Sequence, residues 1–365
     1  MNQSQAHAIL FTPTRIGGVP LKNRVALAPM TRTSAEEDGR PTDEMARYYA
    51  RFARGCYSLV ITEGAYPDEA SSQGYRDQPG IANPAHVEAW RRVVDAVHRE
   101  DGRIFIQLMH AGALSQGNRY TDETIGPSAV KPVGAQLDLY GGHGDFATPR
   151  SMTADDIRAV VDGFVQAARR AREAGFDGVE IHGANGYLLD QFLSDYTNQR
   201  TDEYGGSTEN RVRFLVEVIG AVRAEVGDGY PVGIRISQGK VNDYDHKWAG
   251  GERDAELIFT RIASAGPAFI HITEYDATRP AFDAGETLAE LATRHARVPV
   301  IANGQLGAPE RAESLIANGH AEVITLGKSA LANPDWPRRV MAGEPIEEFD
   351  FSVLQPQANI KEHEL

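Results

Sequence analysis

The stretch FDGVEIHGANGYLLDQFLSDYTNQRTDEYGGSTENR, residues 176–211, carries the strongest structural signal in the chain. Its apolar run over residues 178–181 is long enough for a buried strand. The run gives way to HGANGY, residues 182–187, where glycine and polar residues predict a turn. Apolar residues then recur at helical spacing over residues 188–193. If the strand belongs to a parallel barrel, this junction lies at the rim where active sites are assembled.

Three polar side chains, those of His182, Asn185 and Tyr187, occur within this junction. Histidine and asparagine can both donate a hydrogen bond toward one oxygen, and tyrosine is a weak acid with an ordinary pKa of about 10. Two donors and a weak acid suit a substrate carbonyl that becomes an enolate and is then protonated on carbon. The alternative is structural: a satisfied histidine, a turn asparagine and a tyrosine that packs on the helix. Their clustering favours a functional site.

The sequences HGANGYLLDQFL, residues 182–193, and NQRTDEYGGSTENR, residues 198–211, resemble the signature of the old yellow enzyme family of FMN-dependent ene-reductases. This long combined pattern is more specific than a single glycine-rich turn. The resemblance extends from Pro29 to Asp335. It implies an NADH:flavin oxidoreductase type of enzyme that uses FMN, with NADPH or NADH as reductant.

Composition limits the classes of protein to which the chain can belong. Its 365 residues and 41% hydrophobic content suit one decorated α/β barrel. With the family resemblance, this implies a single FMN-binding domain over residues 1–365. A formal net charge of -14 argues against a nucleic-acid or anionic-membrane partner. The chain shows neither a secretory signal nor an apolar stretch of membrane-spanning length, so we expect a cytoplasmic protein. The single cysteine, Cys56, excludes an internal disulfide, a Cys-ligated zinc site and an iron-sulfur cluster, and we expect it to be buried.

Eight apolar runs alternate with helical patterns along the chain. The predicted strands are residues 25–28, 59–62, 104–108, 178–181, 232–236, 269–273, 298–302 and 323–326. The predicted helices are residues 85–99, 153–174, 210–226, 253–265 and 308–318. This alternation predicts an α/β fold, the (β/α)8 TIM barrel. A doubly wound sheet would need a glycine-rich phosphate turn after the first strand, and APMTRTS, residues 28–34, provides none.

Three segments depart from the regular alternation. Residues 111–150, rich in glycine, proline and polar residues, predict a rim insertion or lid after strand 3. Residues 239–251 form a second irregular stretch at the same rim. Residues 338–365 are expected to form a C-terminal tail on the surface.

A flavin needs donors along its pyrimidine edge, a group that stabilises negative charge near N1, and a phosphate cradle. Candidate residues follow successive strands. By similarity to the family, Thr31 would bond the flavin O4 region, Gln107 the pyrimidine edge and Arg235 the N1 and O2 side. Backbone contacts would come from Pro29, Met30 and Gly64. Each polar residue also has a structural reading, but a charge inside an apolar strand, as at Arg235, must be paired or liganded.

The phosphate end would be built from the loops after strands seven and eight, where barrels often bind phosphate. The candidates are Asn303, Gly304, Gly327 and Lys328. The commonest family pattern has arginine where Lys328 stands. Lysine still neutralises a phosphate but lacks the bidentate fork.

The resemblance implies a two-stage reaction on a small-molecule substrate by a monomer or homodimer. NAD(P)H would reduce the flavin and be replaced by an α,β-unsaturated carbonyl or related alkene. His182 and Asn185 would hold the activating oxygen, Tyr187 would protonate the α carbon, and Tyr75, in SQGY, would line the substrate pocket. Two alternatives stay open: a dienoyl-CoA reductase or amine dehydrogenase-like flavin barrel, and a flavin-binding barrel without turnover. The first is disfavoured because that design needs a cysteine-ligated cluster.

Overall fold

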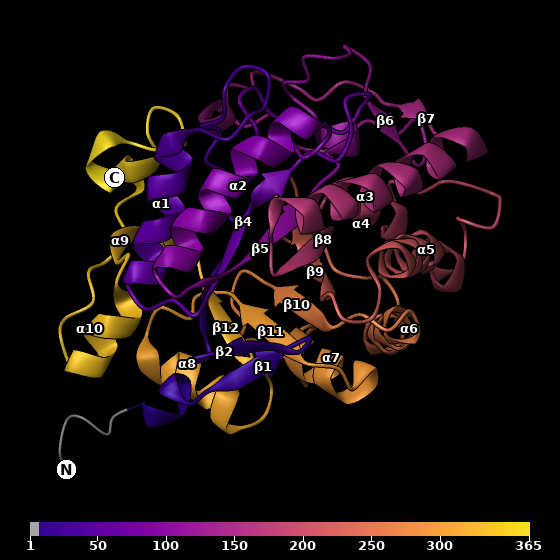
Figure 1. Ribbon diagram of the computed structural model, residues 1–365. Helices are drawn as coiled ribbons and strands as arrows, with labels where there is room; N and C mark the ends of the chain where they lie inside the picture. The colour runs from indigo at the N-terminus through magenta and orange to yellow at the C-terminus, as the bar shows by residue number, and fades with distance from the viewer. Residues whose placement is uncertain (1–6) are drawn as a thin grey trace.

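Eight parallel strands close into a barrel in the computed structural model, which describes residues 7–365 (Figure 1). In spatial order the barrel runs β10-β11-β12-β3-β4-β5-β8-β9. Its strands are β3 (Val25–Leu27), β4 (Leu59–Ala65), β5 (Arg103–Leu108), β8 (Gly178–Asn185), β9 (Val232–Lys240), β10 (Phe269–Thr273), β11 (Val300–Asn303) and β12 (Val323–Leu326). Each predicted strand corresponds to one of them, and the TIM barrel is confirmed.

Two strands continue further than their apolar runs predicted. β8 runs to Asn185 and β9 to Lys240, and the two remain paired across a register shift. His182 lies directly beside Arg235 in this pairing. The prediction that the strand ends at residue 181, before His182 and Asn185, is therefore wrong by four residues. The irregular stretch predicted over residues 239–251 likewise begins inside β9. Pairing to a neighbouring strand, which a hydrophobic pattern does not register, extends both strands.

Helices surround the barrel (Figure 1). They are α1 (Asp43–Arg54), α2 (Pro84–Arg99), α3 (Ala154–Ala174), α4 (Leu188–Leu193), α5 (Thr208–Val226), α6 (Glu252–Ser264), α7 (Leu288–Ala296), α8 (Pro309–Ala317), α9 (Lys328–Ala332) and α10 (Trp336–Ala342). The predicted helices correspond to α2, α3, α5, α6 and α8. Local chemistry sets their ends: Thr153 and Asp156 cap the start of α3 reciprocally, and Gly175, at φ 95, ends it.

An N-terminal hairpin closes the amino end of the barrel, a feature that the sequence patterns did not predict. Its strands, β1 (Thr14–Ile16) and β2 (Val19–Leu21), pair antiparallel. Ile16 and Leu21 are buried and pack with Phe105 and Phe269 of the barrel interior. This apolar plug leaves the carboxyl end of the barrel for polar chemistry.

The rim insertion, residues 111–150, follows β5, the third barrel strand along the chain. It holds η3 (Gly112–Leu114), β6 (Ile125–Gly126), η4 (Asp138–Tyr140) and β7 (Arg150–Ser151). Leu114 and Phe146 of the insertion are buried in one cluster with Tyr75 and Tyr187. The insertion therefore covers the rim at which β8 ends.

Most of the C-terminal tail is exposed, as expected of a surface segment, but two buried residues near its end anchor it. The tail runs past η5 (Phe351–Leu354) and η6 (Glu362–Glu364) beside α1, and Ala358 and Glu364 within it are 0% and 3% exposed (Figure 1). Cys56, expected to be buried, is only half-buried; it lies after α1 in a left-handed backbone conformation, at φ 76.

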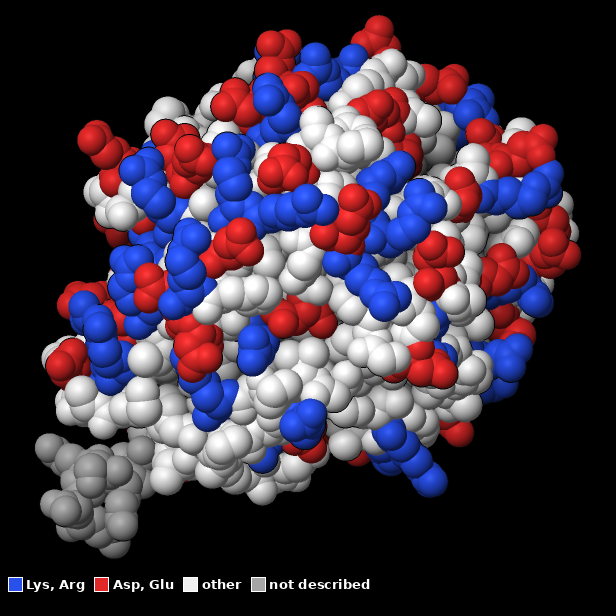
Figure 2. Space-filling view, in the orientation of Figure 1, with Lys and Arg blue, Asp and Glu red and all other residues white. Residues whose placement is uncertain are grey.

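On the face shown in Figure 2, acidic and basic side chains are interspersed over the helices. Within residues 7–365 there is no helix with the length and hydropathy that crossing a membrane requires.

Candidate active site

His182 and Asn185 lie near the end of β8, and Tyr187 follows two residues after it. His182 is 2% exposed, and its ring lies 5.1 Å from that of Tyr187, centroid to centroid. Its buried Nδ1 has no hydrogen-bond partner among the described residues. Asn185 has a left-handed backbone, at φ 63, and its N–H donates to the Ser237 hydroxyl at 2.8 Å. The strand thus turns sharply at Asn185, and the rings of His182 and Tyr187 lie side by side across this turn.

A buried ion pair holds this turn in place. Lys240 and Asp190 are 2% and 0% exposed, and the Lys240 ammonium lies 2.8 Å from the Asp190 carboxylate. The same carboxylate accepts the N–H of Gly186 at 2.6 Å. Gln191 donates to the Gly186 carbonyl at 2.7 Å. Both polar groups of the Gly186 backbone are therefore bonded to α4, which fixes the position of Tyr187 at the first turn of that helix. None of these partners was predicted from the sequence.

Tyr75 is hydrogen-bonded to Tyr187 rather than free in the pocket. Their hydroxyl oxygens lie 2.5 Å apart, and both residues are buried. The ring of Tyr140, from the rim insertion, packs on that of Tyr75 with centroids 4.8 Å apart. Burial raises the pKa of Tyr187 to about 12, although the bond from Tyr75 and the charge of Arg235 act in the opposite direction. Tyr187 is therefore protonated at neutral pH and able to donate.

His182 is a neutral imidazole. Burial, followed by the charge of Arg235 and the proximity of His271, lowers the pKa of His182 well below 6.5. A neutral imidazole carries one N–H and can donate a single hydrogen bond. Nδ1 has no protein partner among the described residues, so this nitrogen is available to a ligand.

Arg235 is a buried cation with unused donors. It is 5% exposed and donates to Thr273 and Asn303 at 3.2 and 3.3 Å, while its buried Nε has no partner among residues 7–365. Burial lowers the pKa of Arg235 to about 10, against the charge of Glu180, so the group stays charged at neutral pH. Asn303, predicted for the phosphate cradle, uses its side chain to hold Arg235 and the Thr325 carbonyl.

A chain of polar side chains lies inside the barrel beside Arg235. Gln107 donates to Glu180 at 2.8 Å, and His271 bridges Glu180 and Thr325 at 2.7 and 2.9 Å. Burial disfavours the charged carboxylate, but His271 and Arg235 outweigh that effect and lower the pKa of Glu180. The sequence patterns did not identify Glu180 and His271. Each is a charged or polar residue within an otherwise apolar strand, and this alone could have indicated a buried group that needs a partner.

Pro29, Met30 and Thr31, predicted to contact a flavin, lie in the loop directly after β3. Pro29 is buried, and Met30 and Thr31 are half-buried. A Cβ on Gly327, after β12, would lie 3.5 Å from the sulfur of Met30, so the two loops are neighbours. A Cβ on Gly64 would lie 2.7 Å from the Met109 side chain, and this close approach explains the glycine.

The two predicted phosphate loops also lie side by side, since β11 and β12 are paired. Gly304, at φ 140, is pressed against the Glu274 carbonyl, which a Cβ would approach to 2.5 Å. Gln305 is exposed in a left-handed conformation, at φ 50. Lys328 is exposed at the first turn of α9, where backbone N–H groups have no intrahelical acceptor. The loops therefore offer backbone donors and one mobile cation to an anion.

These residues fit FMN. The Nε–H of Arg235 is a buried donor without a protein acceptor, and the Nδ1 of His182 is a buried polar atom without a protein partner, so both are available to a ligand. Arg235 would meet the pyrimidine edge of the ring, and the Gly304 and Gly327 loops would meet the phosphate. Among the described residues, no cluster of three or more His, Cys, Asp or Glu side chains is arranged to hold a metal ion.

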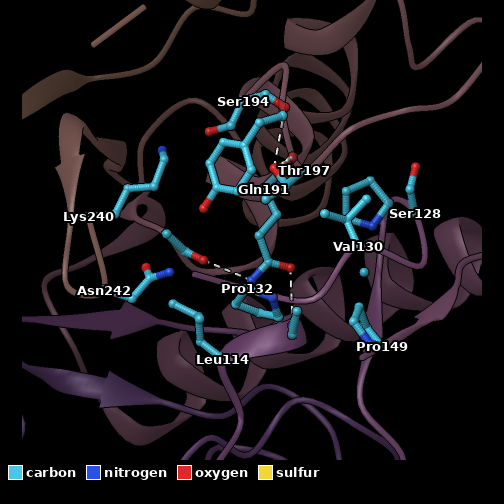
Figure 3. A pocket seen from close by; sticks show the side chains of 15 residues that line it. Leu114, Ser128, Val130, Pro132, Pro149, Gln191, Ser194, Thr197, Lys240 and Asn242 are labelled. Carbon is cyan, nitrogen blue, oxygen red and sulfur yellow. Dashed lines mark hydrogen bonds between the residues drawn. The ribbon is translucent and has the colours of Figure 1, made fainter. Parts of the chain in front are cut away.

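A small pocket lies between the rim insertion and α4 (Figure 3). It is lined by Leu114, Val130, Gln191, Lys240 and Asn242, among others. Its free space of about 10 Å³ is close to that of one water molecule. This pocket is too small for an organic substrate, and its lining includes Gly186 but not His182.

Comparisons with known proteins agree with this geometry. Residues 9–347 match the NADH:flavin oxidoreductase / NADH oxidase family. The chain is 39% identical to the flavin oxidoreductase hxnT of Emericella nidulans, over 94% of this chain and 93% of the relative. It is 37% identical to 12-oxophytodienoate reductase 1 of Oryza sativa subsp. japonica, over 95% of this chain and 90% of the relative. The old yellow enzyme homologue from Zymomonas mobilis superposes with a TM-score of 0.87 at 34% identity, covering 95% of this chain and 96% of that one.

Proposed function

The chain belongs to the old yellow enzyme family of NADH:flavin oxidoreductases, and we propose that within it His182, Asn185 and Tyr187 carry the reduction of an electron-poor alkene. The chemistry that FMN supplies when bound is hydride transfer, from a nicotinamide to the β carbon of the alkene. The observation that carries the proposal is a buried, neutral imidazole whose Nδ1 has no protein partner, with its ring 5.1 Å from that of a protonated phenol.

His182 and Asn185 bind the activating oxygen of the substrate. Each donates one hydrogen bond to the carbonyl or nitro oxygen, which gains negative charge as the β carbon receives hydride. Because His182 is neutral, it stabilises this charge as a hydrogen-bond donor and not by giving up a proton. The locked turn at Gly186 keeps the two donors in position without reorganisation.

Tyr187 provides the proton for the α carbon. Its pKa of about 12 keeps the phenol protonated over the physiological range. The hydrogen bond from Tyr75 stabilises the phenolate that remains after transfer, so Tyr75 acts on the acid as well as lining the pocket.

The remaining candidates would hold the cofactor. Thr31 and Gln107, with the backbone of Pro29, Met30 and Gly64, would contact the ring, and Arg235 would stabilise negative charge at its pyrimidine edge. Gly304, Gly327 and Lys328 would bind the phosphate. Asn303 would orient Arg235, which its hydrogen bond to that guanidinium supports.

We further propose that residues 1–365 act as one FMN-binding domain on small molecules, as a cytoplasmic monomer or homodimer. The closed barrel and the family match over residues 9–347 support the single domain. Size-exclusion chromatography with light scattering tests the oligomeric state.

The function is tested by following flavin absorbance in two half-reactions. Anaerobic mixing with NADPH or NADH should bleach the flavin, and 2-cyclohexenone, a maleimide or a nitro-olefin should restore its colour. Protein that binds flavin but is neither bleached nor reoxidised would instead be a non-catalytic flavin-binding barrel. Reoxidation by dienoyl thioesters but not by simple enones would point to the dienoyl-CoA reductase alternative.

A further inference from the structure

Arg32 is fully buried directly after the proposed cofactor residues Met30 and Thr31. Its guanidinium donates to the Tyr48 hydroxyl and both carboxylate oxygens of Glu364, at 2.8, 2.8 and 2.5 Å. It also donates to the carbonyls of Ala358 and Asn359, at 2.8 and 3.0 Å. Every guanidinium N–H is thus used within the protein, and four of these bonds go to the C-terminal segment.

The partner carboxylate, that of Glu364, is 3% exposed. In addition to Arg32 it binds Arg51 at 3.2 Å and the N–H of Lys361 at 2.9 Å. Arg51 donates as well to the Glu364 carbonyl. A buried carboxylate with two arginine partners is a specific attachment point, unlike the exposed ion pairs of this chain.

The attachment reaches the cofactor loops through the Arg32 backbone. The N–H groups of Arg32 and Thr33 donate to the Glu63 carboxylate at 2.8 and 3.0 Å. Glu63 immediately precedes Gly64, another proposed cofactor residue. The C-terminal segment and the ends of β3 and β4 therefore form one hydrogen-bonded network.

The same segment reaches the rim insertion. The N–H of Ala358, which is 0% exposed, donates to the Leu139 carbonyl at 2.9 Å. Leu139 is adjacent to Tyr140, whose ring packs on Tyr75. Ala358 thus binds the insertion through its N–H and Arg32 through its carbonyl.

We propose that residues 355–365 are a positioning element of the cofactor site, in which Glu364 holds Arg32 and thereby keeps Met30 and Thr31 in the cofactor-binding conformation. Neither Glu364 nor Arg32 is a catalytic residue, since neither touches the reacting atoms. The inference rests on the proposed function, because it requires the loop after β3 to contact FMN.

The test compares Glu364→Gln with Glu322→Gln in the full-length, FMN-loaded protein. Glu322 is a matched control, because it also pairs with an arginine, Arg24, at 2.8 Å, but lies at the amino end of the barrel. We expect Glu364→Gln to weaken FMN binding about tenfold and to shift the flavin absorption maximum and midpoint potential. Glu322→Gln should leave all three unchanged.

A second variant, Tyr48→Phe, removes one partner of Arg32 without changing charge, and is available if Glu364→Gln does not fold. It should shift the flavin absorption maximum and midpoint potential in the same direction as Glu364→Gln does, but by a smaller amount. Because Tyr48→Phe removes no charge, such a shift would come from a change in the position of the loop after β3 and not from the loss of a charge. Unchanged FMN affinity, spectrum and potential in both variants, with only a lower melting temperature, would show a purely structural role and overturn the inference.

Thr31→Ala separates a failure of the proposed cofactor contact from a failure of the proposed positioning role. If it leaves FMN affinity and potential unaltered, the proposed cofactor contact is wrong and the positioning role fails with it. If Thr31→Ala alters them but Glu364→Gln and Tyr48→Phe do not, the cofactor site stands and only the positioning role is refuted.

Discussion

The hydroxyl groups of Tyr75 and Tyr187 are hydrogen-bonded at 2.5 Å although the residues are 112 positions apart. One tyrosine lies in the loop after β4 and the other begins α4, and both are buried. The pair therefore couples two rim loops, and it places a second phenol beside the proposed proton donor.

Replacing Tyr187 by Phe should slow alkene reduction by a factor of about 10² to 10⁴, the usual contribution of a positioned acid. Bleaching of the flavin by NADPH or NADH should change little, because that step needs no proton at the α carbon. Stopped-flow absorbance of each half-reaction measures both rates. Equal losses in the two half-reactions would contradict the assignment.

Tyr75→Phe should slow reoxidation by the alkene by roughly tenfold while preserving the packing of the ring. The bond from Tyr75 lowers the pKa of Tyr187, so its removal leaves a weaker acid and a less stable phenolate. Tyr66→Phe is the control, since Tyr66 is also buried and bonded to a tyrosine, Tyr120, away from the junction. A Tyr75 variant as fast as the control would show that the second hydroxyl does not act on the acid.

Titration of His182 should cause no change in the dissociation constant of an enone between about pH 6 and 8. The pKa of His182 lies well below 6.5 because of burial, so the imidazole is already neutral throughout this range. Dissociation constants from titration of the oxidised enzyme with a non-reducible ketone measure the effect. A binding step with a midpoint near pH 6.5 that disappears in His182→Asn would refute a neutral donor.

Asp190→Asn should lower the free energy of unfolding by about 3 to 5 kcal/mol, because it leaves the buried Lys240 ammonium without its partner. Denaturant unfolding measures the change. Asp145→Asn is the matched control: its partner is also a lysine, Lys131, but both groups are exposed, so this substitution should change the free energy of unfolding far less. Similar losses in the two variants would mean that burial does not distinguish the pairs.

Glu63 should make the protein less stable as pH rises. Burial raises the pKa of Glu63 from 4.5 to about 7, against the hydrogen bonds from Arg32 and Thr33. The folded state therefore favours the protonated form: this contribution is fully present below about pH 4.5 and is lost as pH rises through about 7. The loss amounts to about 3 kcal/mol. The measurement is the free energy of unfolding of Glu63→Gln from pH 4.5 to 8, which should no longer decrease as pH rises. A pH dependence equal to that of the unsubstituted protein would mean that other groups cause the decrease.

The barrel was predictable because its determinants are local. Each strand is a short apolar, β-branched run, and helices such as α3 carry their own caps in adjacent residues. His182, Asn185 and Tyr187 were identifiable for the same reason, since one strand end places all three. The resemblance then associated Thr31, Gln107 and Arg235 with a flavin, and the structure leaves the Nε of Arg235 buried and unpartnered among the described residues.

The tertiary structure alone decided which distant groups meet. Residues 14–21 carry too few apolar positions to signal a hairpin, and Glu364 in NIKEHEL has the composition of a solvated end. Arg32 binds Glu364, Lys240 binds Asp190, and His271 binds Glu180 across 332, 50 and 91 positions of sequence. Such pairs have no local pattern, because a buried charge is stabilised by whichever opposite charge the fold brings within hydrogen-bond distance.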